Sequence, residues 1–458
     1  MNQYDGIKDS DNRWGRAWNA DTYKVATSLL ILTTTPLMVF YFYISAFHFD
    51  CSLFLPIQQI VEGQLTLSEF LALLPPFSWG SALLFLGWVS FQIGLAILPD
   101  GIHRLFPTYK GGSILGSITP GGLRLSYNIN GLQAWLISHL LFLLAAFWFG
   151  WFSPTIIFDH WGTLLWIVNG MGFSLAIFAY VKAYWFPSFP QDRKFSRSVV
   201  YDFFMGIELN PRVGPIDLKL FFNGRPGIVA WTLINISFAS AQYAIHGTLT
   251  NSMLLVNLFQ GLYVLYFFWK EAWYLNTIDI HHDHFGWMLA WGDCVWLPYM
   301  YTLQGLFLVF HPVDLSWQFA TFVLSFGLLG FWIFASSNNQ KDRVRKSDSQ
   351  AVIWGRPPEM ITCSYVTQDG TVRQNRLLAS GWWGVARHMN YTGDLILSLC
   401  YSLACGFDYM FPYFYFLFLS VLLVHRCLRD EDRCRHKYGN YWREYCDRVP
   451  YRLIPKVW

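Results

Sequence analysis

The feature that most constrains how this chain folds is a set of long stretches that contain no charged side chain. The longest covers residues 226–269, which include no Asp, Glu, Lys or Arg over 44 residues. A helix crosses the hydrocarbon core of a bilayer with about 20 apolar residues, so this stretch is long enough for two spans, with a turn expected at residues 247–251. The chain is therefore expected to be an integral membrane protein.

The composition supports the same conclusion. Charged residues make up 13% of the 458 residues and apolar residues 54%, whereas soluble proteins contain roughly 25% charged residues. Aromatic residues reach 19%, including 23 Trp, and Trp and Tyr concentrate at membrane interfaces. The net charge of +3 is too small to indicate a polyanionic partner, so no binding of nucleic acid is expected.

The apolar stretches predict ten transmembrane helices. The last two are short and separated only by residues 407–410, so we expect a hairpin that does not fully cross the bilayer. No Rossmann or P-loop glycine pattern occurs, and the expected fold is an all-α polytopic membrane protein. The predicted spans are residues 25–47, 72–98, 130–152, 161–181, 228–246, 252–274, 287–310, 316–335, 392–406 and 411–425.

Positively charged residues give the orientation of these spans. Of the 32 Lys and Arg residues, 31 lie in the N-terminal segment, in the loops at 99–125, 182–227 and 336–391, and in the tail from His425. The exception, Lys270, lies inside a predicted span. Because Lys and Arg concentrate on the cytoplasmic side of a membrane, both termini and these loops are expected to be cytosolic.

Ionisable residues at membrane depth indicate functional sites, because burying them in hydrocarbon is costly. One region concentrates them, close to the end of the sixth predicted span and the start of the seventh. It is either a polar turn whose charges pair with one another or a pocket that bears an acid and opens to the cytosol. A metal site is the third possibility. Neighbouring histidines cannot share one helix face, whereas His281 and His284, or Asp279 and Asp283, could each align. The remaining ligands would have to come from elsewhere, so no metal is predicted. The residues are Lys270, Glu271, Asp279, His281, His282, Asp283 and His284, followed by Asp293.

A second cluster is basic and lies in the cytosolic C-terminal third. Lys341 and Arg345 are four residues apart and share one face if they are helical. Residues 387–391 (RHMNY) and 426–438 add further cations beside aromatic side chains. Guanidinium groups bind phosphate and stack on aromatic rings, which suits an aromatic ligand that carries phosphate. The alternative is a basic tail that lies on anionic lipid head groups.

Several ordered motifs are similar to those of the sterol reductase family, which includes the Δ14- and Δ7-sterol reductases and the reductase portion of the lamin B receptor. One signature is residues 377–391 (LLASGWWGVARHMNY), and the other runs from LRDEDRC at 428–434 through KYG at 437–439 to YRLIP at 451–455. The loop FFNGRPG at 221–227 and the run HDHFG at 282–286 resemble the Δ7 enzymes most. Further matches lie at residues 127–135, 202–212, 277–286 and 291–299.

This resemblance implies reduction of a ring carbon–carbon double bond of a sterol that enters from the bilayer, with NADPH as the reductant. The preferred substrate is 7-dehydrocholesterol, which would give cholesterol, and Δ14 reduction is the alternative. Membrane lipids are the other expected partners, and the oligomeric state is not indicated. The expected location is the endoplasmic reticulum membrane, or the inner membrane if the source is bacterial.

The resemblance also divides the chain. Residues 1–24 form a short cytosolic segment, residues 25–335 form eight spans with the sterol-access and catalytic region, and residues 336–458 form the NADPH-binding helices, the hairpin and the tail. The positions that it implies for NADPH binding lie in this last part: Lys341, Arg345, Leu378, Trp383, Asn390, Tyr391, Asp430, Cys434, Arg435, His436, Lys437, Tyr438 and Tyr445.

The chemistry of a ring alkene that carries no carbonyl group requires an acid. No carbonyl group can accept the charge of a hydride, so a proton must arrive first or at the same time. In a 5,7-diene, protonation at carbon 8 leaves an allylic cation over carbons 5 to 7, and hydride then reaches carbon 7. Burial raises the pKa of a carboxyl group, which suits a general acid. The candidates are Glu271, Tyr274, Asp279, His282 and Asp283; Asn210, Arg212 and Arg225 are interpreted as bracing a lid.

Two rival interpretations come from other classes. A methyltransferase similar to the isoprenylcysteine carboxyl methyltransferases has comparable C-terminal helices, but it would need S-adenosylmethionine, and the upstream motifs have no place in it. A non-catalytic sterol-binding or scaffold protein resembling the lamin B receptor would carry a large basic N-terminal region. Here about 24 residues precede the first predicted span.

Overall fold

The computed structural model describes residues 19–346, 351–366 and 372–458. The chain forms two compact units, and each is described by itself. The larger unit comprises residues 15–314 and 405–412, and the C-terminal unit comprises residues 315–404 and 413–458.

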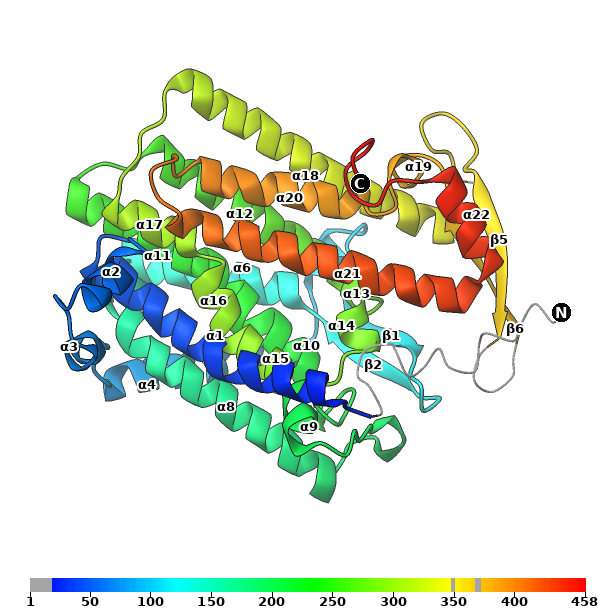
Figure 1. The fold of residues 1–458 in the computed structure, drawn as a ribbon, viewed down its shortest axis with the longest axis horizontal. Coiled ribbons are helices and arrows are strands. Elements are labelled where there is room, and N and C mark those ends of the chain that lie inside the picture. Colours follow the sequence, from blue (N-terminus) through cyan, green and yellow to red (C-terminus); the bar gives the residue numbers. More distant parts are fainter. Residues whose placement is uncertain (1–18, 347–350, 367–371) are drawn as a thin grey trace. The chain divides into compact units, whose positions relative to one another are not determined.

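The larger unit consists mainly of helices, with two small hairpins in its loops (Figure 1). Its helices are α1 (Thr22–His48), α2 (Leu55–Val61), α3 (Leu67–Ala72), α4 (Trp79–Ile97), α5 (Ile102–Leu105), α6 (Gly131–Leu143), η2 (Leu144–Trp148), α7 (Ile156–Asp159), α8 (Trp161–Trp185), η3 (Pro190–Asp192), α9 (Val199–Met205), α10 (Leu218–Phe222), η4 (Asn223–Ile228), α11 (Val229–His246), α12 (Asn251–Trp269), α13 (Glu271–Tyr274), α14 (Ile278–His281), α15 (Trp287–Trp291), η5 (Gly292–Trp296), α16 (Leu297–Met300), α17 (Leu303–Phe310) and η6 (Phe411–Tyr413). The strands are β1 (Gly112–Ile118), β2 (Arg124–Ile129), β3 (Arg212–Val213) and β4 (Ile216–Asp217).

The C-terminal unit contains three long helices, a hairpin and two shorter helices. Its elements are α18 (Trp317–Lys346), β5 (Met360–Val366), β6 (Val372–Leu378), α19 (Trp382–Val385), α20 (Met389–Leu403), α21 (Phe414–Tyr438) and α22 (Asn440–Arg448).

Long apolar helices confirm that this is an all-α polytopic membrane protein. Among the described residues, eight helical segments are long and apolar enough to cross a membrane, and each overlaps a predicted span. The segments are Thr22–His48, Trp79–Ile97, Gly131–Trp148, Trp161–Trp185, Leu218–His246, Asn251–Trp269, Trp317–Lys346 and Phe411–Tyr438. The predicted spans at 287–310 and 392–406 have no counterpart among these eight.

The continuous helix predicted over residues 287–310 is wrong. α15, the π-helical turn η5 and α16 follow one another without interruption over residues 287–300, and the helix is interrupted at Tyr301 and Thr302, before α17. Pro298 lies in the first turn of α16, within this run, where its ring removes one backbone donor. Asp293 lies in the π-helical turn.

The predicted C-terminal hairpin of two short helices also needs correction. α20 has 15 residues, whereas α21 continues through the charged run to Tyr438 and has 25 residues. The continuation is helical because buried residues recur on one face, at Cys427, Glu431, Cys434 and Tyr438. What the sequence suggested as a polar tail is therefore the second half of a long helix.

Two further differences arise from local signals. The predicted span at 72–98 begins only at Trp79, because Pro75 and Pro76 precede it and residues before a proline avoid helical backbone angles. Three hairpins also lie in loops for which no strand was predicted: β1 pairs with β2, β3 with β4, and β5 with β6, all antiparallel.

The predicted cytosolic loops of the larger unit contact one another. The Gly121 N–H donates to Asp192 Oδ1 at 2.6 Å, which joins the 99–125 loop to the 182–227 loop. Ser117 Oγ donates to Asn276 Oδ1 at 3.2 Å, which adds the connection between α12 and α15. These contacts gather the loops at one end of the unit, in agreement with the one-sided placement of Lys and Arg.

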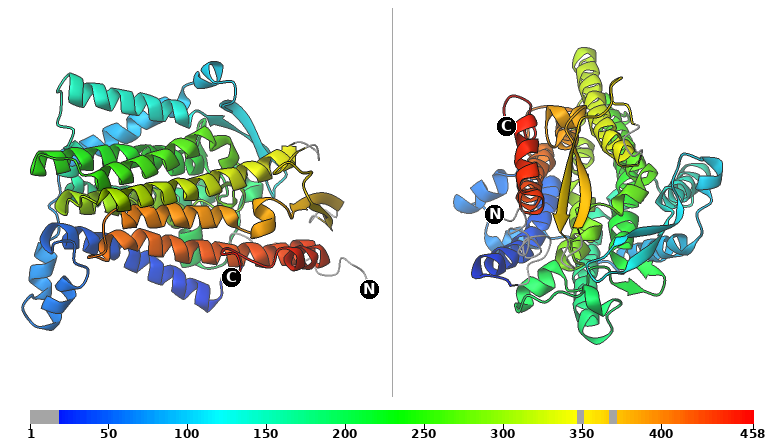
Figure 2. Two further views of the ribbon diagram at one scale, coloured as in Figure 1. Left: turned by 90° about the horizontal axis from the view of Figure 1, so that it is seen from above. Right: turned by 90° about the vertical axis from the view of Figure 1, so that its right-hand side faces the viewer.

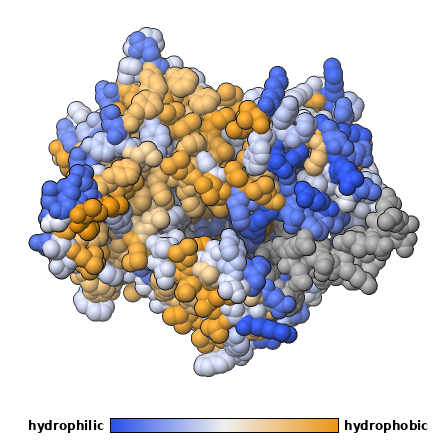
Figure 3. All heavy atoms as spheres, in the orientation of Figure 1, coloured by the Kyte–Doolittle hydropathy of each residue, from blue (hydrophilic) through white to orange (hydrophobic). Residues whose placement is uncertain are grey.

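In the C-terminal unit, α18, α20 and α21 run alongside one another (Figures 1 and 2). A glycine on each of two helices permits their close approach: a Cβ on Gly330 would lie 2.9 Å from the Gly393 carbonyl oxygen. Small residues at helix contacts are characteristic of membrane helices. On the face that Figure 3 displays, apolar side chains cover much of the helices, while hydrophilic ones gather over the end that carries α22.

Candidate functional site

A buried ion pair joins Glu271, at the start of α13, to Arg225, in the π-helical segment η4. Arg225 Nη2 lies 3.2 Å from Glu271 Oε1, and the two side chains are 3% and 1% exposed. Glu271 Oε2 also accepts the Gly131 N–H at 2.6 Å. Burial raises the pKa of the Glu271 carboxyl, and Arg225 and the Gly131 N–H oppose this rise. Both oxygens of Glu271 therefore hold donors.

The start of α6 completes this network. Arg225 Nη2 donates to Asn130 Oδ1 at 2.7 Å, and Asn130 Nδ2 donates to the carbonyl oxygens of Leu95 at 2.9 Å and Leu98 at 2.7 Å. Gly131 has no room for a side chain, since a Cβ there would lie 2.5 Å from the Phe268 ring and 2.6 Å from Glu271 Oε2. The network thus ties α4, α6, η4 and α13 together.

A second buried cation, Lys219, lies under the segment that contains α14. Its side chain is fully buried, and Nζ donates to the carbonyl oxygens of Ile280 at 2.8 Å and Asp283 at 2.7 Å. The carboxylates of Asp217, Asp279 and Asp283 interact electrostatically with it. Lys219 therefore fixes the backbone of this acidic segment and offsets part of its negative charge.

The acidic segment is also held at its end by a contact between two backbones. Gly206 follows α9 and has a φ of +84°, and Gly286 precedes α15. A Cβ on either glycine would clash with the backbone of the other. The Phe285 N–H donates to the Glu208 carbonyl oxygen at 3.0 Å next to this contact. No larger residue fits at either position unless one of the two backbone segments moves.

Asp293 presents a different environment from Glu271. It is buried, and its Oδ1 accepts from Asn223 Nδ2 at 3.3 Å. Its Oδ2 has no hydrogen-bond partner among the residues that the structure describes. Asn223 lies in the π-helical turn η4 and Asp293 in the π-helical turn η5. Such turns are frequent at functional sites. Asp293 is therefore an additional acidic group with an available oxygen.

The structure separates the acid candidates into two groups. Glu271 belongs to the Arg225 network, whereas Asp279, His282 and Asp283 surround the short helix α14, which Lys219 anchors. Tyr274 packs against a cluster that includes Leu275 and Ile280. A pocket beside this group is lined by Gly116, Ser117, Thr119, Tyr127, Leu209, Asn210, Leu275, Ile280 and His281.

In the C-terminal unit, several of the predicted cofactor positions come together around Trp383. Lys341 Nζ lies 4.0 Å from the centre of the Trp383 ring, within the range of a cation–π interaction. Trp383 Nε1 donates to the Ser337 carbonyl oxygen at 2.8 Å, and Tyr445 OH donates to the Trp383 carbonyl oxygen at 3.3 Å. Leu378 packs in the same cluster as Trp383.

A second group lies at the end of α21. Lys437 Nζ is 4.0 Å from the centre of the Tyr365 ring, which belongs to β5. Asn375 Nδ2 donates to Tyr438 OH at 2.6 Å, and Cys434 and Tyr445 pack in the same buried cluster as Tyr438. A cation beside aromatic rings thus lies at the junction of α21, α22 and the β5–β6 hairpin.

Four predicted positions make fewer contacts with these groups. Arg345 and Arg435 are exposed. His436 Nδ1 hydrogen-bonds to the Asp432 carbonyl oxygen at 2.6 Å. Asp430 lies 3.7 Å from Arg433, and both Asp430 and Arg345 interact electrostatically with Lys341, which lies over Trp383.

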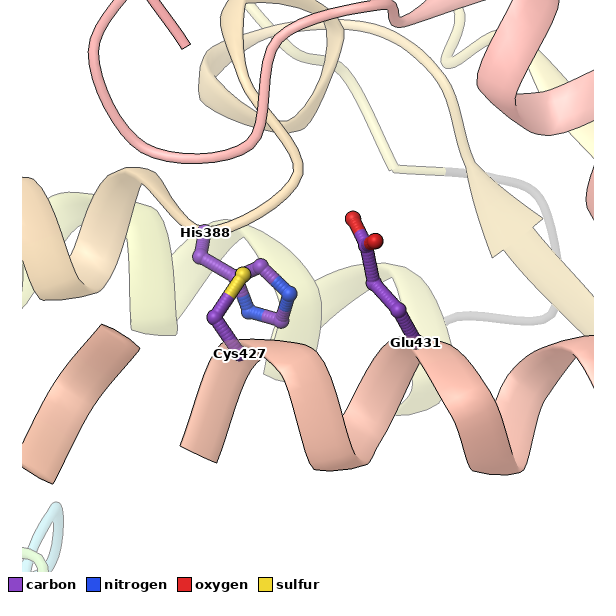
Figure 4. Close-up of side chains that lie close together, drawn as sticks. All are labelled: His388, Cys427 and Glu431. Carbon is purple, nitrogen blue, oxygen red and sulfur yellow. The ribbon is translucent and has the colours of Figure 1, made fainter. Parts of the chain in front are cut away.

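A buried cluster of opposite charges lies beside the predicted cofactor positions. Arg387 Nε and Nη2 donate to Glu431 Oε1 at 2.8 Å and 2.6 Å, and Arg452 Nε donates to Glu431 Oε2 at 2.8 Å. His388, Cys427 and Glu431 offer ligand atoms within 4.8 Å of one another (Figure 4). Because two guanidinium groups already occupy the Glu431 carboxylate and oppose a further cation, we interpret this as an ion-pair cluster rather than a metal site.

Neither Lys219 nor Glu431 was among the predicted site residues, although each holds a set of buried polar contacts. Lys219 is a charged residue a few positions before the long uncharged stretch, and the cost of burying such a residue near a membrane could have drawn attention to it. Glu431 follows Cys427 by four residues, so the two share a helix face. Its pairing with Arg387 and Arg452 arises from long-range contacts that no local pattern predicts.

Comparisons with known proteins cover nearly the whole chain. The family described as "Ergosterol biosynthesis ERG4/ERG24 family" matches residues 21–458. A 7-dehydrocholesterol reductase from Xenopus laevis is 52% identical over 452 residues, 98% of this chain and 96% of the relative. One from Danio rerio is 51% identical over 97% of this chain and 94% of the relative. A Δ14-sterol reductase from Methylotuvimicrobium alcaliphilum is 37% identical over 94% of each chain.

Proposed function

The chain belongs to the ergosterol biosynthesis ERG4/ERG24 family, and on this premise we propose that it reduces the Δ7 double bond of a sterol, 7-dehydrocholesterol, to give cholesterol. The observation that carries this proposal is the likeness along the whole length to relatives named 7-dehydrocholesterol reductase, at 52% and 51% identity. The overall reaction consumes one proton and one hydride, which become the two new hydrogen atoms on carbons 8 and 7.

The second candidate is reduction of a Δ14 bond. A bacterial relative named Δ14-sterol reductase is 37% identical over 94% of this chain, and one from Dictyostelium discoideum is 38% identical over 82%. A 7-dehydrocholesterol reductase from Arabidopsis thaliana is 39% identical over 76% of this chain, but the identity to the Xenopus and Danio relatives named for the Δ7 reaction exceeds that to the Δ14 relatives by about 14 percentage points. This difference favours the Δ7 substrate.

We propose NADPH as the reductant, and the C-terminal unit has residues that fit it. Asn390 Oδ1 is buried and has no hydrogen-bond partner within the described part of the chain, which is unusual unless a ligand supplies one. Lys341 lies over Trp383 and Lys437 beside Tyr365, so cations and aromatic faces are available for phosphate and base groups. When bound, NADPH supplies the hydride.

The residues of this chain have distinct tasks in the proposal. Lys341, Arg345 and Lys437 would bind the phosphates, while Trp383, Tyr391 and Tyr438 offer aromatic faces. Asp430, Cys434, Arg435, His436 and Tyr445 complete the implied set, although Arg435 and His436 point toward the surface of α21. For these two we propose contacts with the outer, charged end of the dinucleotide.

For the proton, we propose a donor in the segment from Asp279 to Asp283, with Asp293 as a further candidate. Both oxygens of Glu271 are already engaged, by Arg225 and by the Gly131 N–H. We therefore propose that Glu271 and Arg225 orient the segment rather than donate the proton. Aromatic faces nearby, including the stacked rings of Trp287 and Trp291 at 4.7 Å, would stabilise a developing cation.

The test is direct. Purified protein is incubated with NADPH and either 7-dehydrocholesterol or a Δ14-sterol, and the sterols are analysed by mass spectrometry. Conversion of 7-dehydrocholesterol alone supports the proposal, and conversion of the Δ14-sterol alone supports the second candidate. Absence of both, with S-adenosylmethionine rather than NADPH raising the melting temperature, would favour a methyltransferase. We also propose the endoplasmic reticulum membrane as the location, which imaging of a tagged chain would test.

A further inference from the structure

We infer that His388, together with Asn390, binds the carboxamide of the nicotinamide ring, so that the cofactor lies with this end at the start of α20 and its phosphates toward the end of α21. This inference rests on the proposed function, because it concerns the binding of NADPH. It assigns a role to His388, which the family resemblance does not, and it gives the cofactor a direction.

Two unsatisfied polar atoms point to a ligand at this place. His388 is 5% exposed, and its Nε2 is buried without a hydrogen-bond partner in the parts of the chain that the structure describes. The same holds for Asn390 Oδ1, two residues later in the first turn of α20. Leaving such an atom unsatisfied costs roughly 1–3 kcal/mol, so each of the two is a candidate contact for a bound polar group.

The imidazole of His388 is held in place by its neighbours. Its backbone N–H donates to the Arg452 carbonyl oxygen at 2.9 Å, and its ring stacks on Tyr391 with centroids 5.1 Å apart and planes 8° apart. The ring lies beside Cys427 and Glu431 (Figure 4). It is therefore presented rigidly, with one nitrogen available.

The chemistry of the two atoms selects an uncharged amide. Burial lowers the pKa of His388 to about 4, an effect that Asp430 and Glu431 oppose while Lys341 and Arg387 reinforce it. The imidazole is thus neutral near pH 7 and does not attract an anion. Asn390 Oδ1 is an acceptor only, so it needs a donor. A carboxamide offers an NH₂ group and a carbonyl oxygen side by side, whereas a phosphate or a carboxylate offers no donor.

The direction of the cofactor follows from the spacing along α21. Cys427, beside His388, and Lys437, beside Tyr365, are ten residues apart on this helix. This corresponds to about 15 Å at 1.5 Å per residue. The uncharged nicotinamide ring would lie near Cys427, and the charged phosphates would lie near Lys437, whose cation attracts anions.

The first experiment compares two ligands on purified protein by isothermal titration calorimetry. NADPH contains the nicotinamide, whereas 2′,5′-ADP lacks it. For His388→Ala we expect the Kd for NADPH to rise about tenfold, the worth of one hydrogen bond, while the Kd for 2′,5′-ADP changes less than about twofold. Lys437→Ala should weaken both ligands. His425→Ala, an exposed histidine of α21, is the matched control and should change neither.

The main comparison of the second experiment uses the wild-type chain alone. The wild-type chain is titrated with reduced 3-acetylpyridine adenine dinucleotide phosphate, in which a methyl group replaces the carboxamide NH₂. We expect it to bind about tenfold more weakly than NADPH, and Asn390→Leu should abolish this difference. Equal affinity of the wild-type chain for the two dinucleotides would overturn the inference, as would equal weakening of NADPH and 2′,5′-ADP in His388→Ala. If neither ligand binds the wild-type chain, the proposed cofactor itself is wrong.

Discussion

Arg225 and Glu271 form an ion pair, 3.2 Å apart, in which both side chains are almost completely buried. Such a pair is strongly sensitive to the loss of one partner, because the remaining charge is left without compensation. The pair connects the π-helical segment η4 to α13, the first turn after α12. Several expectations follow from this pair and from the other buried charges of the chain.

Removing Arg225 alone should be more damaging than removing both members of the pair. For Arg225→Leu we expect a loss of about 3–5 kcal/mol in the free energy of unfolding, since a buried carboxylate loses its cation. The double variant Arg225→Leu/Glu271→Gln should recover part of that loss. Thermal melting in detergent of the two single variants and the double variant measures the coupling; fully additive effects would contradict a direct interaction.

Gly131 should not tolerate even one methyl group. In Gly131→Ala the new Cβ would crowd the Phe268 ring and Glu271 Oε2, and overpacking of this kind costs about 1–3 kcal/mol. Gly261→Ala is the control, since a Cβ there has no neighbour within 4 Å and alanine favours a helix. The melting temperature should fall for the first variant and hold or rise for the second. Equal melting temperatures would exclude the crowding.

In the C-terminal unit, the ion pairs of Glu431 and of Glu444 should contribute very differently to the free energy of unfolding. Glu431→Gln removes the charge that pairs with the buried Arg387 and the half-buried Arg452, with an expected loss of about 3–5 kcal/mol. Glu444→Gln breaks the exposed pair with Arg448 and should cost no more than about 0.5 kcal/mol. Differential scanning fluorimetry compares the two, and a similar shift for both would argue against the buried cluster.

Stability should depend on pH through His388. Its folded-state pKa lies near 4 because of burial, below the value of roughly 6.5 for an unfolded chain. Between these values the unfolded chain binds the extra proton, so this residue destabilises the fold as the pH falls from about 6.5 to 4. His388→Gln should make the melting temperature less dependent on pH in that window. An unchanged pH profile would mean that the imidazole is not buried as described.

The proton donor can be located by conservative substitution. Asp279→Asn, His282→Ala, Asp283→Asn and Asp293→Asn are each tested for turnover of the sterol, with NADPH binding measured in parallel. We expect at least one to lose about 100-fold or more in turnover, the usual worth of a general acid, while the cofactor still binds. If all four keep full turnover, the acid lies elsewhere, and Glu271 and Tyr274 are the next residues to substitute.

The membrane architecture could be predicted from the sequence because its signal is local and strong. Uncharged stretches such as residues 226–269 are long enough to leave few alternatives, and the corresponding helices α11 and α12 lie where they were expected. The incorrect predictions also have physical causes. Residues 287–310 are apolar enough to be read as one span, but the helix contains a π-helical turn and is interrupted at Tyr301 and Thr302, before α17. Hydropathy does not register either feature.

The buried charge contacts could be predicted only in part. The concentration of acids and histidines near Glu271 was visible, but the partner of each was not: Arg225 comes from a segment 46 positions earlier, and Arg452 reaches Glu431 from the end of the chain. Such pairings depend on tertiary packing rather than on helical spacing. His388 Nε2, which has no hydrogen-bond partner among the described residues, can likewise be recognised only once the surrounding structure is known.

The two glycines that face each other after α9 and before α15 have a mechanical consequence. The backbones of Gly206 and Gly286 are in contact, and the Phe285 N–H donates to the Glu208 carbonyl oxygen beside them. Moving the loop that follows α9 on its own would break this hydrogen bond, so its motion is coupled to that of residues 278–286 and of the acids that they carry.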